Sequence, residues 1–349
     1  MDMHKRIVVA LMISCLFIIL AGCNNDETEA GGLTKITFTE PSRILSLAPF
    51  YVAIEQGFFE EEGIEANIAS GGGGAQVIAT LLSGEAQFAI SGPRSMFSAL
   101  EADKELLAIQ SLNSALTFEI AVADEYLKDK GVTANSSLAD RVAVLNGAKI
   151  GTNLVGDSGD VYMRYLMKLH GQDPLSVETV KLSGVGPKIG GMKEGIVDGG
   201  INSAPFSLQA KDQEVGSLLL KASEEPKYAN MVWEVVFAEK KYMEENPELT
   251  EKVVRAIGKG IEFAREEPKK TAKSIISYFD GIEVQILEDS LIGMVDTFQG
   301  YGEMNQEAWG NAQDPLIEFS EMSGVGIEHD TKPGAIWTND YVEKVFSEK

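Results

Sequence analysis

The alternation of apolar and polar positions divides the body of the chain into short strands and amphipathic helices. Ile36 to Thr39 alternates like a strand, and Phe50 to Gln56 has the pattern of a helix that Gly57 ends. The elements expected next are a strand over 65–69, a helix over 75–82, a strand over 88–90 and a helix opened by Pro93. Because strands alternate with helices, the pattern predicts parallel sheets with crossover helices.

Residues 1–22 have the pattern of a secretory signal peptide. Lys5 and Arg6 precede an apolar run over 7–20, which is shorter than the roughly 20 residues that a spanning helix needs. Leu20-Ala21-Gly22-Cys23 resembles the bacterial lipoprotein cleavage box, in which the cysteine becomes the lipidated first residue. The resemblance predicts a lipid on Cys23 that anchors the protein to the outer face of the cell membrane. The polar segment 23–33 is expected to be a flexible tether.

An internal echo indicates two lobes built on one plan. Residues 83–93 and residues 194–205 each run from a glycine turn through a short strand and small polar residues to a proline. Each is preceded by a glycine-rich loop and a helix, at 71–74 and at 184–186. The expected lobes are 34–118 plus 233–349 and 119–232, connected by two strand-like crossovers at 117–122 and 231–237. The helical segments 247–264 and 268–279 are then expected to return to the first lobe.

Charge and cysteine content exclude several classes of protein. The net charge of −23 repels nucleic acid, so no nucleic-acid partner is expected. Of the two cysteines, Cys15 lies in the signal peptide and Cys23 carries the lipid, so the body has neither a disulfide nor a thiolate metal site. No phosphate-binding loop and no His/Cys cluster is present, and the expectation is no cofactor and no metal.

Three segments resemble one family of transport proteins. They are Phe50 to Glu65, Leu81 to Phe88 and Asn146 to Gly151, followed by a closing segment over 182–205. Together they resemble the substrate-binding proteins for nitrate, sulfonates, taurine and thiamine-precursor pyrimidines. One departure from the pattern is Gln87, where many members carry an acid. Another is the acidic loop at Asp157 to Asp160, which counts against a simple anion as the ligand.

The resemblance implies a fold and a function. The fold would be α/β, two-lobed and periplasmic-binding-protein-like, with two sheets flanked by helices and joined by two crossover strands. The function would be that of an extracytoplasmic lipoprotein, monomeric and not an enzyme. It would capture a small polar or heteroaromatic solute by hinge closure and deliver it to an ABC permease.

Ligands of open α/β sheets bind beyond the carboxyl ends of the strands, where helix starts present free N–H groups. Aromatic side chains near these loops could stack on a flat part of the ligand. The candidate ligand-binding residues are Ser46, Leu47, Tyr51, Gly72, Gly73, Ser91, Gly92, Arg94, Asn113, Phe118, Asp157, Ser158, Gly159, Gly184, Val185, Asn202 and Trp233.

Several candidates have a structural interpretation that stays open beside the functional one. Asp157 and Asp160 are spaced like a helix N-cap and its partner, so capping and ligand contact are both open. The same choice between a structural role and ligand contact applies to Gly71 to Gly74, Arg94, Trp233 and Tyr51.

Three other functions are alternatives to solute capture. An enzyme with Ser158 as nucleophile is disfavoured because His170 lies one helix away and His329 lies in an acidic loop near the C-terminus. A dinucleotide site at Gly184-Val185-Gly186 is disfavoured because its spacing is not that of the dinucleotide fingerprint. A sensor or adhesin subunit with the same two lobes stays open.

Overall fold

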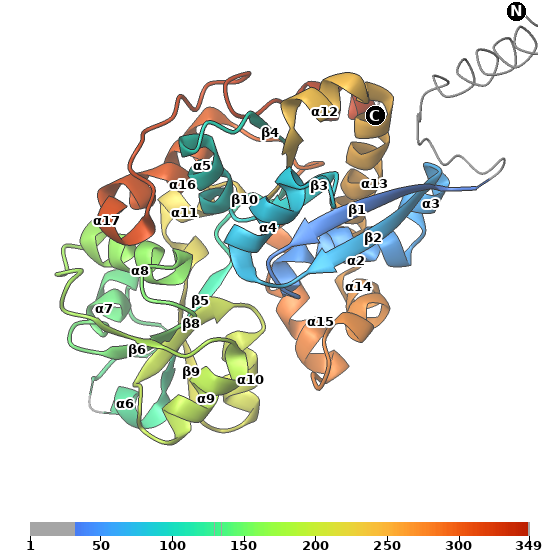
Figure 1. Ribbon diagram of the computed structural model, residues 1–349. Coiled ribbons are helices and arrows are strands. Elements are labelled where there is room, and N and C mark those ends of the chain that lie inside the picture. The colour runs from blue at the N-terminus through green and yellow to red at the C-terminus, as the bar shows by residue number, and fades with distance from the viewer. Residues whose placement is uncertain (1–31, 129, 134, 348–349) are drawn as a thin grey trace, which may run out of the picture. The chain divides into compact units, whose positions relative to one another are not determined.

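The computed structural model describes residues 32–128, 130–133 and 135–347, and the chain from Lys35 onward forms one compact unit. The predicted signal peptide, Cys23 and nearly all of the predicted tether lie outside the described residues. The unit contains two five-stranded sheets (Figure 1). The first consists of β1 (Thr34–Glu40), β2 (Ile64–Ser70), β3 (Phe88–Ser91), β4 (Leu106–Asn113) and β10 (Trp233–Glu239). The second consists of β5 (Phe118–Ala123), β6 (Lys149–Thr152), β7 (Glu178–Lys181), β8 (Gly199–Ser203) and β9 (Gly216–Lys221).

The two sheets share one strand order, which explains the internal echo in the sequence. The orders are β2-β1-β3-β10-β4 and β7-β6-β8-β5-β9, so each strand of the first sheet has a counterpart in the second. The echoed segments form β3 and β8, which occupy the central position of their sheets. Each follows a helix that a glycine opens, α4 (Gly73–Leu82) after Gly72 and α9 (Val185–Lys193) after Gly184. The α/β, two-lobed fold predicted from the sequence is therefore confirmed.

The alternation of strands and helices predicted parallel sheets, and this was wrong in part because both sheets are mixed. β1 pairs with β3 and β6 pairs with β7 and β8 in parallel, as crossover helices require. β10 and β5 run antiparallel to both of their neighbours. The chain reaches each of these two strands directly from the other sheet, over 114–117 and over 222–232, and not through a crossover helix. Each strand therefore starts at the edge where its neighbours end, and runs in the opposite direction.

The helices cover both sheets. Those of the first lobe are α2 (Ala48–Glu55), α3 (Phe58–Glu61), α4, α5 (Pro93–Glu101), α12 (Lys240–Glu245), α13 (Pro247–Glu266), α14 (Pro268–Ile275), α15 (Val284–Ile292) and α18 (Asp340–Phe346). Those of the second are α6 (Asp124–Lys128), α7 (Leu138–Ala143), α8 (Ser158–Leu169), α9, α10 (Phe206–Asp212) and α11 (Pro226–Ala229). The 3₁₀ turns are η1 (Leu45–Leu47), η2 (Ala222–Glu224), η3 (Ile276–Tyr278) and η4 (Val295–Thr297).

The helix α13 returns the chain to the first lobe, as the sequence predicted. Pro247 occupies its first turn, where no intrahelical N–H is needed, and Val253, Val254 and Ile257 are buried on one face. A Cβ at Gly260 would lie 2.1 Å from the carbonyl oxygen of Pro49 in α2. The two helices therefore approach more closely than any larger residue would permit.

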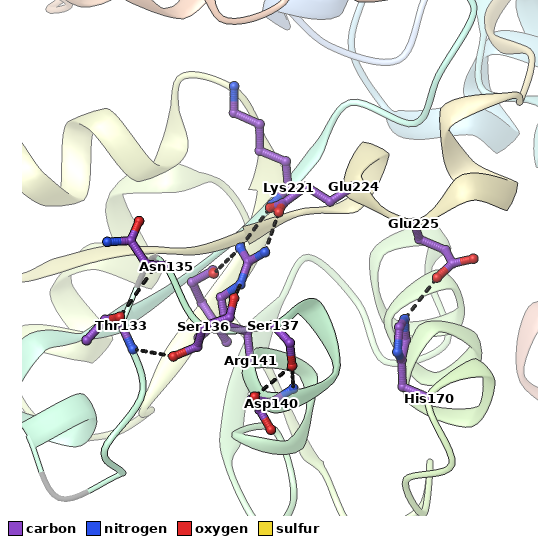
Figure 2. Close-up of polar contacts among 11 residues, drawn as sticks. Thr133, Asn135, Ser136, Ser137, Asp140, Arg141, His170, Lys221, Glu224 and Glu225 are labelled. Carbon is purple, nitrogen blue, oxygen red and sulfur yellow. Dashed lines mark hydrogen bonds and ion pairs between the residues drawn. The ribbon is translucent and has the colours of Figure 1, made fainter.

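The second passage between the sheets is held by a buried arginine. Arg141 of α7 donates to the carbonyl oxygen of Leu219 at 3.1 Å and pairs with both carboxylate oxygens of Glu224 (Figure 2). Glu224 also accepts the backbone N–H of Lys221 at 2.8 Å. The guanidinium and carboxylate hold each other charged, since their contact raises the pKa of Arg141 and lowers that of Glu224. The end of β9 is thus fixed just before the chain leaves the sheet.

The C-terminal segment contacts both lobes through α16 (Gln306–Glu318) and α17 (Ser320–Ser323). The hydroxyl of Tyr162 in α8 donates to the carbonyl oxygen of Ala312 at 2.7 Å. On the other side, α16 packs against α5, and Phe97 meets Trp309 edge to face at 5.8 Å. The contacts group 35–349 as a single unit, so the predicted division of the lobes at 119–232 stays a prediction.

Candidate functional site

Three aromatic rings meet where the chain passes between the sheets. Trp233, which opens β10, contacts Phe118, which opens β5, with ring centroids 5.1 Å apart. It also meets Tyr162 of α8 edge to face at 5.6 Å. A Cβ at Gly92 would lie 3.2 Å from the indole ring, so the absence of a side chain there leaves room for Trp233. Gly92, Phe118 and Trp233, three of the candidates, therefore lie together where the chain passes between the sheets.

Polar groups of the first lobe gather at the carboxyl edge of its sheet. The Nδ2 of Asn113 donates to the carbonyl oxygen of Ser46 at 2.8 Å, and its Oδ1 accepts from Thr297 at 3.1 Å. The hydroxyl of Ser46 in turn donates to Oε1 of Glu234 at 3.3 Å. Burial raises the pKa of Glu234 to about 8, an effect that nearby Glu40 adds to and Ser46 opposes. The structure brings Ser46 and Asn113 together and adds a carboxyl group that was not a candidate.

In the second lobe, Asp157 is the N-cap of α8. Its carboxylate accepts the backbone N–H groups of Asp160 at 2.9 Å and of Asn153 and Leu154 at 3.1 Å each. Burial raises the pKa of Asp157 even though these hydrogen bonds and Lys188 oppose the rise. Asp160 does not complete a capping box, because it accepts from Gly156 N and pairs with Arg164 at 2.7 Å. The capping interpretation of Asp157 is thus the one that its contacts favour.

A buried lysine organises the carboxyl edge of the second sheet. The Nζ of Lys188 in α9 donates to Oδ1 of Asn153 at 2.6 Å and to Oδ1 of Asn202 at 3.3 Å. Its side chain lies against Gly151 and Gly200, where added Cβ atoms would lie 3.2 and 3.3 Å from it. Burial lowers the pKa of Lys188 to about 8, and the charge of Asp157 opposes this. The site therefore holds a lysine whose pKa burial brings well below that of an exposed lysine.

Arg94 lies in α5 of the first lobe and reaches the C-terminal segment. Its Nε donates to the carbonyl oxygen of Ser323 at 2.9 Å, and an Nη donates to the same atom. Burial lowers the pKa of Arg94, while Asp157 and Tyr162 of the second lobe oppose this. One carboxylate, Asp157, thus acts on both Arg94 and Lys188. Arg94 is not a solvated surface arginine.

The other candidates lie in helices, turns and strand ends of the two lobes. Tyr51 is fully buried in the first lobe, where its hydroxyl donates to Glu40 at 2.8 Å and its ring stacks on Tyr278 at 4.5 Å. Gly72 and Gly73 have left-handed φ values of 81° and 72°, and the N–H of Gly73 is used by Pro41 O. The remaining candidates are at the ends of strands or the starts of helices: Leu47 in η1, Ser91 at the end of β3, Ser158 and Gly159 opening α8, Gly184 capping α9 and Val185 opening it. The role of every candidate in binding stays a prediction.

Sequence reasoning missed Lys188, Glu234 and Thr152. Glu234 leaves a signal in the sequence, since it is a lone carboxylate within the apolar run Met231 to Phe237. Lys188 leaves none, because lysine in a helix is usually exposed and its burial depends on Gly151 and Gly200 from two other elements. Thr152 ends β6 with a buried hydroxyl for which the described residues offer no hydrogen-bond partner.

The geometry gives no support to catalysis at Ser158. Ser158 begins α8 and His170 follows its last residue, and at about 1.5 Å per residue the two lie at opposite ends of the helix. His170 instead contacts Glu225 at 2.9 Å (Figure 2). Within the described ranges, no three His, Cys, Asp or Glu residues are placed to hold a metal ion. Nor does that part of the chain contain a helix long and apolar enough to cross a membrane.

The family model described as NMT1/THI5 like matches residues 45–271, which is more than half of the chain. The chain belongs to the NMT1/THI5-like family. A shorter match relates it to YtlA of Bacillus subtilis, whose name describes it as a binding protein, with 36% identity over 77 residues. That match spans 22% of this family member and 22% of YtlA, so it relates one segment of the two chains.

Solved structures share the fold over nearly the whole chain. The periplasmic nitrate-binding protein NrtA from Synechocystis PCC 6803 superposes with a TM-score of 0.68 at 15% identity, covering 90% of this chain and 89% of NrtA. The periplasmic aliphatic sulphonate binding protein SsuA from Escherichia coli gives 0.68 at 16%, covering 88% and 99%. The desulfurization enzyme DSZB gives 0.60 at 13%, covering 90% and 99%. At these identities the likeness establishes the periplasmic-binding-protein-like fold.

Proposed function

We propose that this protein is the extracytoplasmic solute-binding component of an ABC importer. It captures a small polar or heteroaromatic solute between its two lobes and delivers it to a permease. The observation that carries the proposal is the set of buried polar groups at the carboxyl edges of both sheets, beside the hinge aromatics Phe118 and Trp233. Membership of the NMT1/THI5-like family and the transport-related names of NrtA and SsuA also support it.

Capture requires that the lobes close over the solute by bending at the two passages between the sheets. Trp233 is placed to report this motion. It directly follows the passage over 222–232, and its ring contacts Phe118, which directly follows the passage over 114–117. Closure is expected to change the indole fluorescence and to reduce the radius of gyration in X-ray scattering. An unchanged scattering profile at saturating solute would contradict hinge closure.

The first experiment is a thermal-shift screen of the full-length protein, purified in a mild detergent. The panel contains taurine, alkyl sulfonates, nitrate, pyrimidines, aromatic carboxylates and polyamines. A ligand present at about 100 times its dissociation constant stabilises the native state by about 2.7 kcal/mol, which a melting curve resolves. Saturable stabilisation followed by uptake through a co-expressed permease supports the proposal. Chemical turnover of the stabilising solute, followed by mass spectrometry, would instead favour an enzyme, as in DSZB.

The lipid anchor is a separate part of the proposal, because Cys23 lies outside the described residues. In cells fed a labelled fatty acid, the wild-type protein is expected to carry the label and to sediment with membranes. Cys23→Ser is expected to carry no label. A labelled Cys23→Ser protein would contradict the assignment of the anchor without touching the proposal on solute capture. A sensor or adhesin role would be favoured if a solute binds but no permease takes it up.

A further inference from the structure

Two neighbouring residues at the start of β10 each carry a buried polar atom that has no partner. Trp233 and Glu234 are 3% and 2% exposed. Among the described residues, neither Nε1 of Trp233 nor Oε2 of Glu234 finds a hydrogen-bond partner. A buried polar group left unpaired costs about 1–3 kcal/mol, and native structures contain few of them. One unpaired donor and one unpaired acceptor in adjacent residues therefore indicate a partner that is bound from outside.

The backbone at Glu234 supports a role for its side chain. Its φ of 52° lies in the left-handed region, where residues other than glycine, asparagine and aspartate are uncommon. Such a conformation costs about 1–3 kcal/mol and persists where the surrounding structure enforces it, often in ligand sites. Glycine would relieve the strain at this position. The position nevertheless carries a glutamate, and that glutamate lies at the carboxyl edge of the first sheet beside Ser46.

Among the residues that the structure describes, no cation pairs with Glu234. Its near neighbour Glu40 is paired with Arg43 at 2.9 Å, whereas no ion pair joins Glu234 to any lysine, arginine or histidine of the described ranges. The cations of the site have other partners. Arg94 donates to Ser323 O and Lys188 to two asparagine side chains, and both share the nearby charge of Asp157. The ionisable group of the site that has no oppositely charged partner is thus a carboxyl, not a cation.

We propose that Glu234 accepts a hydrogen bond from an N–H group of the captured solute, which is a neutral or cationic nitrogen compound rather than a simple anion. The inference rests on the solute-capture function proposed above and names the chemical class that the site selects. The indole N–H of Trp233 donates to an acceptor atom of the same solute. Once Glu234 is ionised, a nitrate or alkyl sulfonate ion, which has only acceptor atoms, would bring a second negative charge to a buried carboxylate, which disfavours it.

The test uses two pairs of probes that match in shape and differ in charge. Benzamidinium and benzoate form one pair, methylguanidinium and nitrate the other, and each is titrated calorimetrically at about pH 9, where Glu234 is ionised. The cation of at least one pair is expected to bind at least about tenfold more tightly than its anion. In Glu234→Gln this preference is lost, because the amide is uncharged. Tighter binding of the anions, or a preference that survives in Glu234→Gln, overturns the inference.

Two further variants separate recognition from folding. Glu288→Gln removes another buried carboxyl, one that pairs with Lys273 of α14, and is expected to keep the wild-type preference. Trp233→Phe keeps an aromatic ring and removes the N–H, and is expected to weaken the preferred probe by about fivefold to tenfold. Melting curves of each variant show whether it folds. A loss of preference in Glu288→Gln equal to that in Glu234→Gln contradicts a specific role of Glu234.

Capture from a small-molecule extract removes the dependence on chosen probes. The full-length protein is incubated with the extract, washed and denatured, and the released solutes are identified by mass spectrometry. A solute with an N–H group that wild type retains and Glu234→Gln loses supports the inference. A retained solute that has only acceptor atoms overturns it while leaving solute capture intact. Retention of nothing, together with no binding of any probe, contradicts the proposed function itself.

Discussion

Arg94 and Ser323 are joined by two hydrogen bonds, although they lie 229 positions apart in the sequence. Both the Nε and an Nη of the arginine donate to one carbonyl oxygen, with the Nε at 2.9 Å. This contact ties α5 of the first lobe to α17, and α17 also packs against α8 of the second lobe. The segment near the C-terminus thus connects α5 with α8, in addition to the two passages between the sheets.

Arg94→Gln is expected to lower the free energy of unfolding by about 1.5–3 kcal/mol, the usual contribution of a hydrogen bond from a charged group. The measurement is urea denaturation followed by circular dichroism. Arg265→Gln is the matched control, because Arg265 also donates to backbone carbonyls, those of Phe298 and Gly300, but within the first lobe. If Arg94→Gln also weakens solute binding and Arg265→Gln does not, Arg94 serves the binding site, either through its contact with Ser323 or by contacting the solute. Equal effects on binding would contradict this.

Gly156→Ala is expected to destabilise the protein by about 1–3 kcal/mol. The residue has a left-handed φ of 79°, and its added Cβ would lie 2.5 Å from the carbonyl oxygen of Met322 in α17. Gly171→Ala separates the two effects, since its φ of 70° is similar and nothing lies within 4 Å of the added Cβ. The difference in melting temperature between the variants measures the steric contact. Identical melting temperatures would mean that α17 moves away at no cost.

The unfolding free energy of the empty protein is expected to fall as the pH rises from 4.5 to about 8, because of Glu234. Its folded-state pKa is raised, so in this window the folded chain holds one proton more than the unfolded chain. The contribution is present below pH 4.5 and is lost as the pH rises through the folded pKa, at up to about 1.4 kcal/mol per pH unit. Urea denaturation of Glu234→Gln is expected to lack this part of the slope. The same slope in both proteins would contradict the raised pKa.

Lys188 is expected to act on stability in the opposite direction and at higher pH. Its folded-state pKa of about 8 lies below its ordinary value of 10.5, so between these values the unfolded chain binds the extra proton. Stability from this group therefore rises with pH between about 8 and 10.5, by up to about 1.4 kcal/mol per pH unit. Lys188→Met removes this rise in denaturation measurements. Lys168→Met, at an exposed lysine of α8, serves as control and is expected to keep it.

The sequence was sufficient for the two-lobed α/β fold and for the N-cap of α8. The glycine-marked echo predicted that β3 and β8 are equivalent, and the spacing of Asp157 and Asp160 indicated an N-cap. Both signals are local in sequence. Glu234 meets Ser46 across 188 positions and Arg94 meets Ser323 across 229, so no local pattern encodes either pair. The burial of Lys188 depends on glycines from two strands, a property that appears only when the sheet has formed.

The place of β10 in the sheet sets the order in which the protein can be completed. β10 lies between β3 and β4, yet it is made after all five strands of the second sheet. While the chain emerges from the ribosome, the first sheet consists of two separate pieces until residue 239 has been synthesised. The first sheet therefore cannot close until the whole second sheet has been made, and strand pairings so distant in sequence are expected to form slowly.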